Sequence, residues 1–379
     1  MLPIAMLTGA SSYLLYHVMP EPIHRIGPAL SSSVSALQPS LIFAMLFLTF
    51  CRIEPKDLKP HRWHWWLLLI QGGLFVLLGF AAWTLIRHVP SESHNWVVII
   101  ESAMLCLICP TATAAAVVTR KLGGDIPGIT TYIVLINILT AVLVPLMVPM
   151  IQPSSDSDFW TSFSMIMAKV FPLLISPCLC AWLVRYLAPV LHARLLKYPD
   201  LPFYLWAVGL TLAIAVTTKA IVHSEMSISL ILAMSVVSLL CCAFQFATGR
   251  YVGSRYRPRR RSQQSDCRNS DVCVAHSITA FHAARCESPQ DCLPAAHDPV
   301  FCAEGGTVFV FRSQTAEERG REVRKVTAGQ AMGQKNTIFA IWLAYTFMTP
   351  ETAIVGGLYS IWHNIYNSWQ LRRAMRDDL

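Results

Sequence analysis

The feature that most constrains this chain is a series of apolar blocks, each long enough to cross a lipid bilayer. A transmembrane helix needs about 20 mainly apolar residues, and blocks of that length recur along most of the sequence. Charged residues make up only 14% of the 379 residues, well below the roughly 25% of soluble domains. We therefore predict an all-α polytopic membrane protein. Its ten predicted spans cover residues 2–20, 33–53, 65–87, 96–119, 129–151, 160–186, 202–222, 226–249, 328–349 and 352–371.

Positive charges are distributed unevenly between the loops that join these spans. Lys and Arg are retained on the cytoplasmic side of a membrane. They gather in the loops after the second, fourth, sixth and eighth predicted spans and in the C-terminal tail, whereas residues 152–159 hold neither. Both termini are therefore predicted to face the cytoplasm, which an even number of spans requires. This bias accounts for the net charge of +8, so no nucleic-acid partner is expected.

The predicted spans divide into two sets of five on either side of residues 152–159. Because five is odd, the second set must enter the membrane the opposite way up, which is the condition for an inverted repeat. Secondary transporters commonly contain such repeats and bind their substrates near the midplane on interrupted helices. We predict a first five-helix repeat over 1–151, a second over 152–256 and 326–379, and a hydrophilic cytoplasmic insertion at 257–325.

The fourth span of each half contains an interruption. In the first half, "CPTATAAAVVT" (109–119) places Pro110 inside the span, where it removes a backbone donor and disfavours helix at the residue before it. In the second half, "TAGQAMGQKNT" (327–337) has two glycines and several amide or ammonium side chains before its apolar run. Two such interruptions would bring backbone groups without helical partners together inside the membrane.

Residues 257–325 differ in composition from the spans around them. They are rich in charge and too poor in apolar residues for a core, so they are predicted to be a disordered insertion or a sequence anomaly. The spacing of their Cys and His matches no usual zinc pattern, and no metal site is expected. These residues are Cys267, Cys273, Cys286, Cys292, Cys302, His276, His282 and His297.

Three segments lie at matching positions in a family of membrane transporters: "CPTATAAAVVTRKLGGD" (109–125), "GQKNT" (333–337) and "SIWHNIYNS" (360–368). Together they resemble the bile acid:sodium symporter family, in a bacterial-type member with a hydrophilic insertion. The resemblance implies ten helices in a panel domain and a core domain, with the fourth and ninth helices unwound where they cross. It also implies carriage of an organic anion, such as a bile acid, with sodium across a bacterial plasma membrane.

The sequence departs from the family's sodium-binding motif in the ninth span. That motif is Glu-x-x-x-Gln-Asn, and here Gln330 or Ala331 takes the position of its Glu, depending on whether Gln334 or Asn336 anchors the comparison. Lys335 brings a positive charge instead. A sodium ion beside that charge would be repelled. We therefore predict transport that depends weakly on sodium, with sodium or a proton as the coupling ion.

Polar side chains inside the predicted spans supply the candidate site, because ionisable groups within a membrane are costly and usually serve a function. Apart from the coupling ion, no cofactor is expected. The candidate substrate- and ion-binding residues are Thr111, Thr113, Asn137, Gln330, Gln334, Lys335, Asn336, Thr337, His363 and Asn364.

The main candidates each have a structural alternative. Lys335 either faces a wet binding cavity or reaches toward the membrane interface. Glu101 is either a proton carrier or a carboxylate near the outer interface. His363 either titrates near neutral pH or packs inside the helix bundle. Asn137 either binds an ion or bonds a neighbouring helix.

These features predict a secondary active transporter that carries a small organic anion by alternating access. Its partners would be that anion and the lipid bilayer. The alternative is a membrane-embedded enzyme that uses Glu101 or His363 with a Cys, although no nucleophile and base share a recognisable motif. A channel is a third option, but paired broken helices suit alternating access better.

Overall fold

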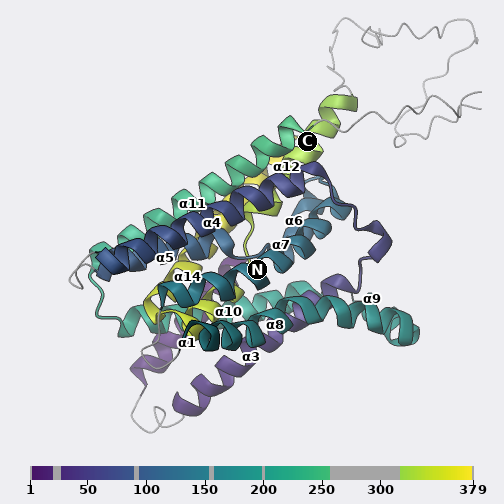
Figure 1. Cartoon of the computed structure of the whole chain (residues 1–379). Coiled ribbons are helices and arrows are strands. Elements are labelled where there is room, and N and C mark those ends of the chain that lie inside the picture. Colours follow the sequence, from purple (N-terminus) through teal and green to yellow (C-terminus); the bar gives the residue numbers. More distant parts are fainter. Residues whose placement is uncertain are drawn as a thin grey trace, which may run out of the picture. The chain divides into compact units, whose positions relative to one another are not determined.

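A computed structural model of the chain describes residues 2–19, 27–88, 94–152, 158–198, 201–256 and 316–377. These residues form helices that are joined by short connections, with no named strand among them (Figure 1). The helices are α1 (Leu2–Val18), α3 (Gly27–Phe50), α4 (Arg62–His88), α5 (His94–Ile108), α6 (Ala114–Lys121), α7 (Ile126–Ile151), α8 (Phe159–Leu187), α9 (Pro189–Leu196), α10 (Leu201–His223), α11 (Ile228–Arg255), α12 (Ala316–Gly333), α13 (Thr337–Phe347) and α14 (Pro350–Asp377), with a 3-10 turn at Pro55–Asp57.

Six of the described helices are long and apolar enough to cross a membrane: α3 from Ser32, α4, α7, α8, α10 and α11. Two shorter apolar helices, Asn95–Ile108 and Thr337–Phe347, belong to interrupted segments. The prediction of an all-helical membrane protein is therefore confirmed.

Both predicted interruptions are present. α5 ends at Ile108 and α6 begins at Ala114, on either side of Pro110, while α12 ends at Gly333 and α13 begins at Thr337. Pro110 has no backbone N–H to continue α5. A continuous helix through the polar residues after Gly333 would have no apolar face to bury, so packing would not stabilise it.

Two helical segments were not predicted. α9 is too short and mixed in polarity to resemble a span, and Pro189 at its first position favours a helix start. α12 begins at Ala316, inside the predicted insertion. Its first half is polar, so apolar blocks in the sequence do not indicate it. The Cys and His residues of the predicted insertion lie outside the described residues, as does most of the unit Arg257–Gly320 that contains them.

The helices of the other compact unit, Met1–Tyr256 and Arg321–Leu379, form two packed groups. In the first, which we call the α1 group, α1 packs on α10, α10 on α3, and α3 on α8. In the second, the α5 group, α4 packs on α5 and α7, α11 packs on α5 and α14, and α13 packs on α14. The groups meet mainly where α7 packs on α8 and where α10 packs on α13 and α14.

Close helix packing brings α12 into the α5 group. Gly249 and Gly253 are four residues apart on α11, and a side chain at either position would collide with the backbone carbonyl of Ala328 or Arg324 on α12. The missing side chains therefore let the two backbones approach, as small residues do between membrane helices.

Candidate functional site

The two helix interruptions cross each other and pair through their backbones. Thr111 and Lys335 form an isolated antiparallel β-bridge. The Ala112 N–H donates to the Gln334 carbonyl at 2.9 Å, and the Asn336 N–H donates to the Pro110 carbonyl at 2.8 Å. Irregular backbone is tolerated at membrane depth only where its polar groups find partners. Each interruption here supplies partners for the other.

The C-terminal carbonyls of α5 are satisfied by groups from other helices. The last carbonyls of a helix have no partner within it, so a buried helix end needs donors from elsewhere. We call the four donor side chains the α5 cap. They are Gln245 to the Cys106 carbonyl (3.1 Å), Lys335 to the Leu107 carbonyl (3.2 Å), Thr140 to the Ile108 carbonyl (2.9 Å) and Gln71 to the Cys109 carbonyl (3.5 Å).

Lys335 is the charged member of the α5 cap. Its side chain is 1% exposed, and it borders a cavity of about 10 Å³, which is room for about one water. A helix C-terminus carries roughly half a negative charge, so the ammonium group lies where a cation is favoured. This gives the buried lysine a structural role at the end of α5.

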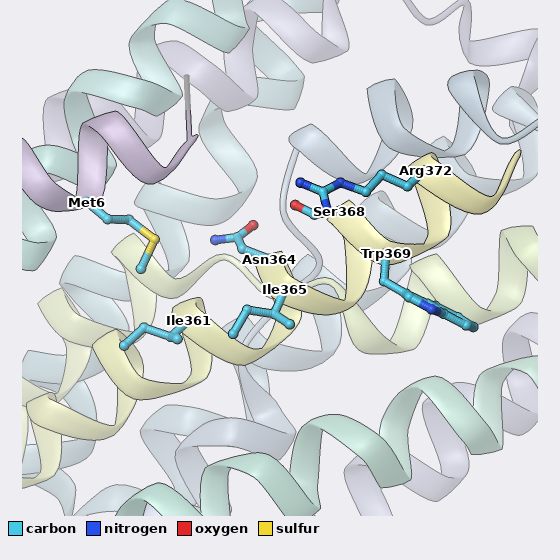
Figure 2. A pocket seen from close by; sticks show the side chains of 7 residues that line it. All are labelled: Met6, Ile361, Asn364, Ile365, Ser368, Trp369 and Arg372. Atoms are coloured by element: carbon cyan, nitrogen blue, oxygen red, sulfur yellow. The ribbon is translucent and has the colours of Figure 1, made fainter. Parts of the chain in front are cut away.

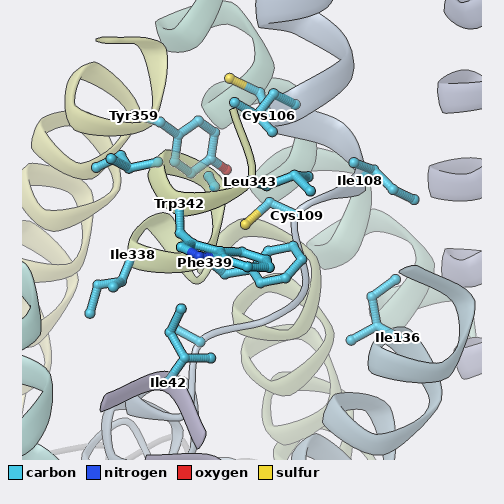
Figure 3. Packing of buried hydrophobic residues seen from close by; sticks show 14 of the residues in the cluster. Ile42, Cys106, Ile108, Cys109, Ile136, Ile338, Phe339, Trp342, Leu343 and Tyr359 are labelled. Atoms are coloured by element: carbon cyan, nitrogen blue, oxygen red, sulfur yellow. The ribbon is translucent and has the colours of Figure 1, made fainter. Parts of the chain in front are cut away.

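Packing around this lysine is dense. Cys106, Cys109 and Tyr359 line the same small cavity as Lys335. Figure 3 shows the two cysteines and the tyrosine grouped near the end of α5. The Tyr359 hydroxyl donates to the Gly333 carbonyl at 2.8 Å, so α14 also satisfies the end of α12. A space of this size excludes an organic substrate from the immediate surroundings of the ammonium group.

Side chains of the interruptions mostly bond to the crossing itself. The Thr111 hydroxyl donates to the Ala331 carbonyl at 2.5 Å. The Asn336 side chain accepts from the Phe339 N–H at 3.2 Å and so caps the start of α13. Thr113 precedes α6 but makes no side-chain cap bond. Thr337, the first residue of α13, is buried beside the small cavity next to Lys335.

Four amide side chains near the crossing retain polar atoms with no hydrogen-bond partner among the described residues. Both amide atoms of Asn137 and the side-chain oxygens of Gln245, Gln330 and Gln334 are in this state. Asn137 is 1% exposed and lies one turn before Thr140, which bonds the end of α5. Leaving a buried amide unpaired costs about 1–3 kcal/mol. These atoms are therefore the strongest local candidates to contact an ion or a polar substrate group.

α14 contributes the remaining predicted residues. Gln330 donates to the side chains of Asn367 at 3.0 Å and Gln370 at 2.7 Å, which ties α12 to α14. Asn364 donates to Ser360 at 3.3 Å. The His363 ring is 2% exposed and packs edge-on against Tyr359 with ring centres 5.6 Å apart. Neither His363 nor Asn364 bonds the crossing through a described contact.

Glu101 lies away from the crossing. Its carboxylate accepts hydrogen bonds from Gln152 at 2.5 Å and from the Thr352 hydroxyl at 2.8 Å. These partners are at the end of α7 and in the first turn of α14, and Glu101 is about 10 Å from Ile108 along α5 at 1.5 Å per residue. The N-terminus of α14 carries a partial positive charge, which also favours the Glu101 carboxylate beside Thr352.

A larger cavity lies between α1 and α14, and we call it the Arg372 cavity (Figure 2). It has a volume of about 380 Å³. Residues four apart on a helix share a face, so α14 presents a polar row and an apolar row to this space. The polar row is Asn364, Ser368 and Arg372; the apolar row is Ile361, Ile365 and Trp369, with Met6 of α1 opposite.

Several of these residues were missed in the sequence. Gln71 and Gln245 are amides inside long apolar runs, which is a usable signal, but the predicted site includes Lys335, at an interruption, and neither of these two. The sequence predicts Arg372 only as part of the basic tail that fixes orientation. Lys169, within "MIMAKVFPL" of α8, is a charge inside a predicted span and is not among the predicted site residues.

The apolar helices and the paired interruptions define a polytopic helical membrane protein with a broken-helix crossing. The chain belongs to the SBF-like CPA transporter family, whose sequence profile matches residues 6–280. This confirms the resemblance to bile acid:sodium symporters, and a transporter family favours transport over the enzyme alternative. No curated protein matches the chain.

Proposed function

We propose that this protein is a secondary active transporter that moves a small organic anion across a membrane by alternating access. The observation that carries the proposal is the crossing, in which two interrupted helices complete each other's backbone hydrogen bonds. Transporters place substrate and ion sites near such interruptions. The interface between the α1 group and the α5 group supplies a second element that the mechanism needs, a surface along which two bodies can move.

The ten-span inverted repeat is part of this proposal. α5 with α6 would form one interrupted span and α12 with α13 another, each fourth in its half of the chain. The second half would then consist of α8, α10, α11, the α12–α13 pair and α14. An odd number of spans per half supports opposite orientations of the halves. The distribution of Lys and Arg supports cytoplasmic termini in a bacterial plasma membrane.

The Arg372 cavity supports an amphipathic organic anion as the substrate. Its walls are mostly apolar with a few polar groups, which is the usual composition of small-molecule sites. Arg372 offers a guanidinium group that binds carboxylate, sulfonate or sulfate in a bidentate way. Asn364 and Ser368 would bond polar groups along one edge of the ligand, while Ile361 and Ile365 contact its apolar edge.

Lys335 supports weak dependence on sodium. The chain has no acid among residues 330–336, and the ammonium group already neutralises the end of α5. A proton carried by Lys335 or Glu101 is the coupling ion that we favour. The enzyme alternative is less well supported because the chain belongs to a transporter family.

The proposal is tested by uptake of radiolabelled taurocholate and estrone 3-sulfate into proteoliposomes that contain the purified protein. We expect saturable uptake of at least one anion, competition by the other, and no uptake by protein-free liposomes. The matched variants are Arg372→Gln and Arg376→Gln, since Arg376 lies one turn further on and does not line the cavity. Arg372→Gln should raise KM several-fold, and Arg376→Gln should not. Absence of saturable uptake of both anions would contradict the proposed function.

A further inference from the structure

Lys169 is a charged side chain inside an apolar helix. It lies about 15 Å from the start of α8 at 1.5 Å per residue, and its ammonium group lies 5.4 Å from the centre of the Phe347 ring. The ion pairs found among the described residues join Glu54 to Lys56 and Arg185, and Glu322 to Lys325, so none of them involves Lys169. An ionisable group within a helix that can cross a membrane is usually functional.

Lys169 borders a cavity of about 510 Å³, which we call the Lys169 cavity. Its volume is in the range of small-molecule sites, and its walls combine apolar surface with a few polar groups, as such sites do. Ser176, Thr346 and Trp342 are its other lining residues with polar side-chain atoms. The remaining walls are Pro39, Phe43, Pro172 and Leu173.

The Lys169 and Arg372 cavities have the same chemistry. Each contains one basic side chain, one tryptophan and at least two polar side chains on mainly apolar walls. In each, the basic group takes part in no ion pair among the described residues. The two sites therefore suit one kind of ligand, an amphipathic anion with a single charged group.

Their positions are also related. The Lys169 cavity lies between α3 and α8 of the α1 group and α13 of the α5 group, and the Arg372 cavity lies between α1 and α14. Both therefore lie on the interface between the groups. Thr346 and Phe347 end α13, a few residues before α14 begins at Pro350, whereas Arg372 is about 33 Å along α14 from Pro350. The cavities are near opposite ends of the same interface.

From these relations we infer that the Lys169 cavity is a second binding subsite for the transported anion, at the opposite end of the interface from the Arg372 cavity. The inference rests on the proposed function for the identity of the ligand. The anion binds Lys169 on one side of the membrane and Arg372 on the other, and the crossing lies between the two. Lys335 is not a ligand in either subsite, because its cavity is too small.

The charge and the access of the Lys169 cavity are measured with thiol reagents of opposite charge. Thr346→Cys places a thiol in the cavity, and Thr346 is exposed and makes no described hydrogen bond. The protein is reconstituted in nanodiscs of phosphatidylcholine and treated with 2-sulfonatoethyl or 2-(trimethylammonium)ethyl methanethiosulfonate. Mass spectrometry quantifies the modification of position 346 alone, so the native cysteines do not contribute.

We expect the anionic reagent to react faster than the cationic one, and taurocholate or estrone 3-sulfate to slow it. Adding Lys169→Gln should lower the anionic-to-cationic rate ratio at least fivefold. The matched control is Lys219→Gln, a lysine of α10 that does not border the cavity. An unchanged ratio with Lys169→Gln, or no modification by either reagent, would overturn the subsite.

Anionic lipid is the other possible source of a negative group at Lys169. Nanodiscs with phosphatidylglycerol distinguish the two sources, because protection by that lipid without protection by either soluble anion would mean a lipid site and would overturn the inference. The thiol rates do not depend on transport. If the thiol modification rates behave as expected while proteoliposomes take up neither anion, the proposed function is wrong, but the Lys169 cavity is still shown to be charged and accessible.

Discussion

Replacing sodium by choline is expected to change anion uptake by less than twofold in the wild-type protein. The reason is the Lys335 ammonium group, which is buried at the crossing and bonded to the Leu107 carbonyl at 3.2 Å. A sodium ion held by the polar groups of residues 334–336 would lie within several ångströms of it. No carboxylate in that stretch would offset the repulsion.

The magnitude follows from Coulomb's law with an effective dielectric constant of about 20. Two unit charges repel by about 4 kcal/mol at 4 Å and by about 2 kcal/mol at 8 Å. Since about 1.4 kcal/mol corresponds to a factor of ten, the ammonium group would weaken sodium binding by about 30-fold to about 1,000-fold. A site with a dissociation constant of about 1 mM would then have one of about 30 mM to about 1 M, so a sodium ion about 4 Å from the ammonium group would be largely unbound at about 0.1 M sodium.

The assay is initial uptake of the labelled anion at fixed pH and osmolarity over a series of sodium concentrations. Lys335→Ala should abolish uptake without sodium, because α5 loses the positive charge at its C-terminus, and added sodium should restore part of it if the ion enters the vacated space. Lys219→Ala is the matched control and should behave as wild type. Wild-type uptake that rises steeply and saturably with sodium would refute the reasoning, as would unaltered sodium-free uptake by Lys335→Ala.

Three further predictions concern the two threonines of the crossing, Asn137 near it, and Glu101 away from it. Thr111→Val should lower the free energy of unfolding by about 1–3 kcal/mol, seen as a lower thermal midpoint, because the buried Ala331 carbonyl loses its donor. Thr113→Val removes no described side-chain bond, so it should leave the midpoint unchanged and lower uptake. Asn137→Leu should raise the free energy of unfolding by about 1 kcal/mol, since an unpaired buried amide is removed, and should lower uptake. A lower thermal midpoint would instead show that the Asn137 amide stabilises the fold. Uptake should rise when the outer medium is acidified, and Glu101→Gln should flatten that pH profile; an unchanged profile would exclude Glu101 as the proton carrier.

The two interruptions could be predicted from local sequence, because their causes are local. Pro110 lacks the donor that helix continuation needs, and Gly333 precedes three consecutive polar residues in a membrane segment. Lys335 was correctly singled out for the same reason. Its partner was not predictable, since the Leu107 carbonyl is more than 200 residues away in the chain and meets the lysine only when the interruptions cross.

The rest of the α5 cap depended on tertiary packing. Gln71, Thr140 and Gln245 come from three different helices, and nothing in their own surroundings indicates that they converge on one helix end. Arg372 was misinterpreted for a related reason. A basic residue at a helix end serves equally well as an orientation signal and as a wall of a cavity, and only the tertiary structure, which places Met6 of α1 opposite α14, distinguishes the two.

The hydrogen bonds described here suggest which parts would move together during transport. Those of the crossing, of the α5 cap and of Gln330 join elements of the α5 group, including α12. Within the α1 group, Thr211 bonds Ala5, and Arg185 reaches the loop after α3. The Lys169 and Arg372 cavities lie between the groups and have mainly apolar walls. Apolar contacts lack the directionality of hydrogen bonds, so sliding along this interface would cost less than opening either group. Alternating access would therefore expose one cavity and then the other while the crossing stays intact.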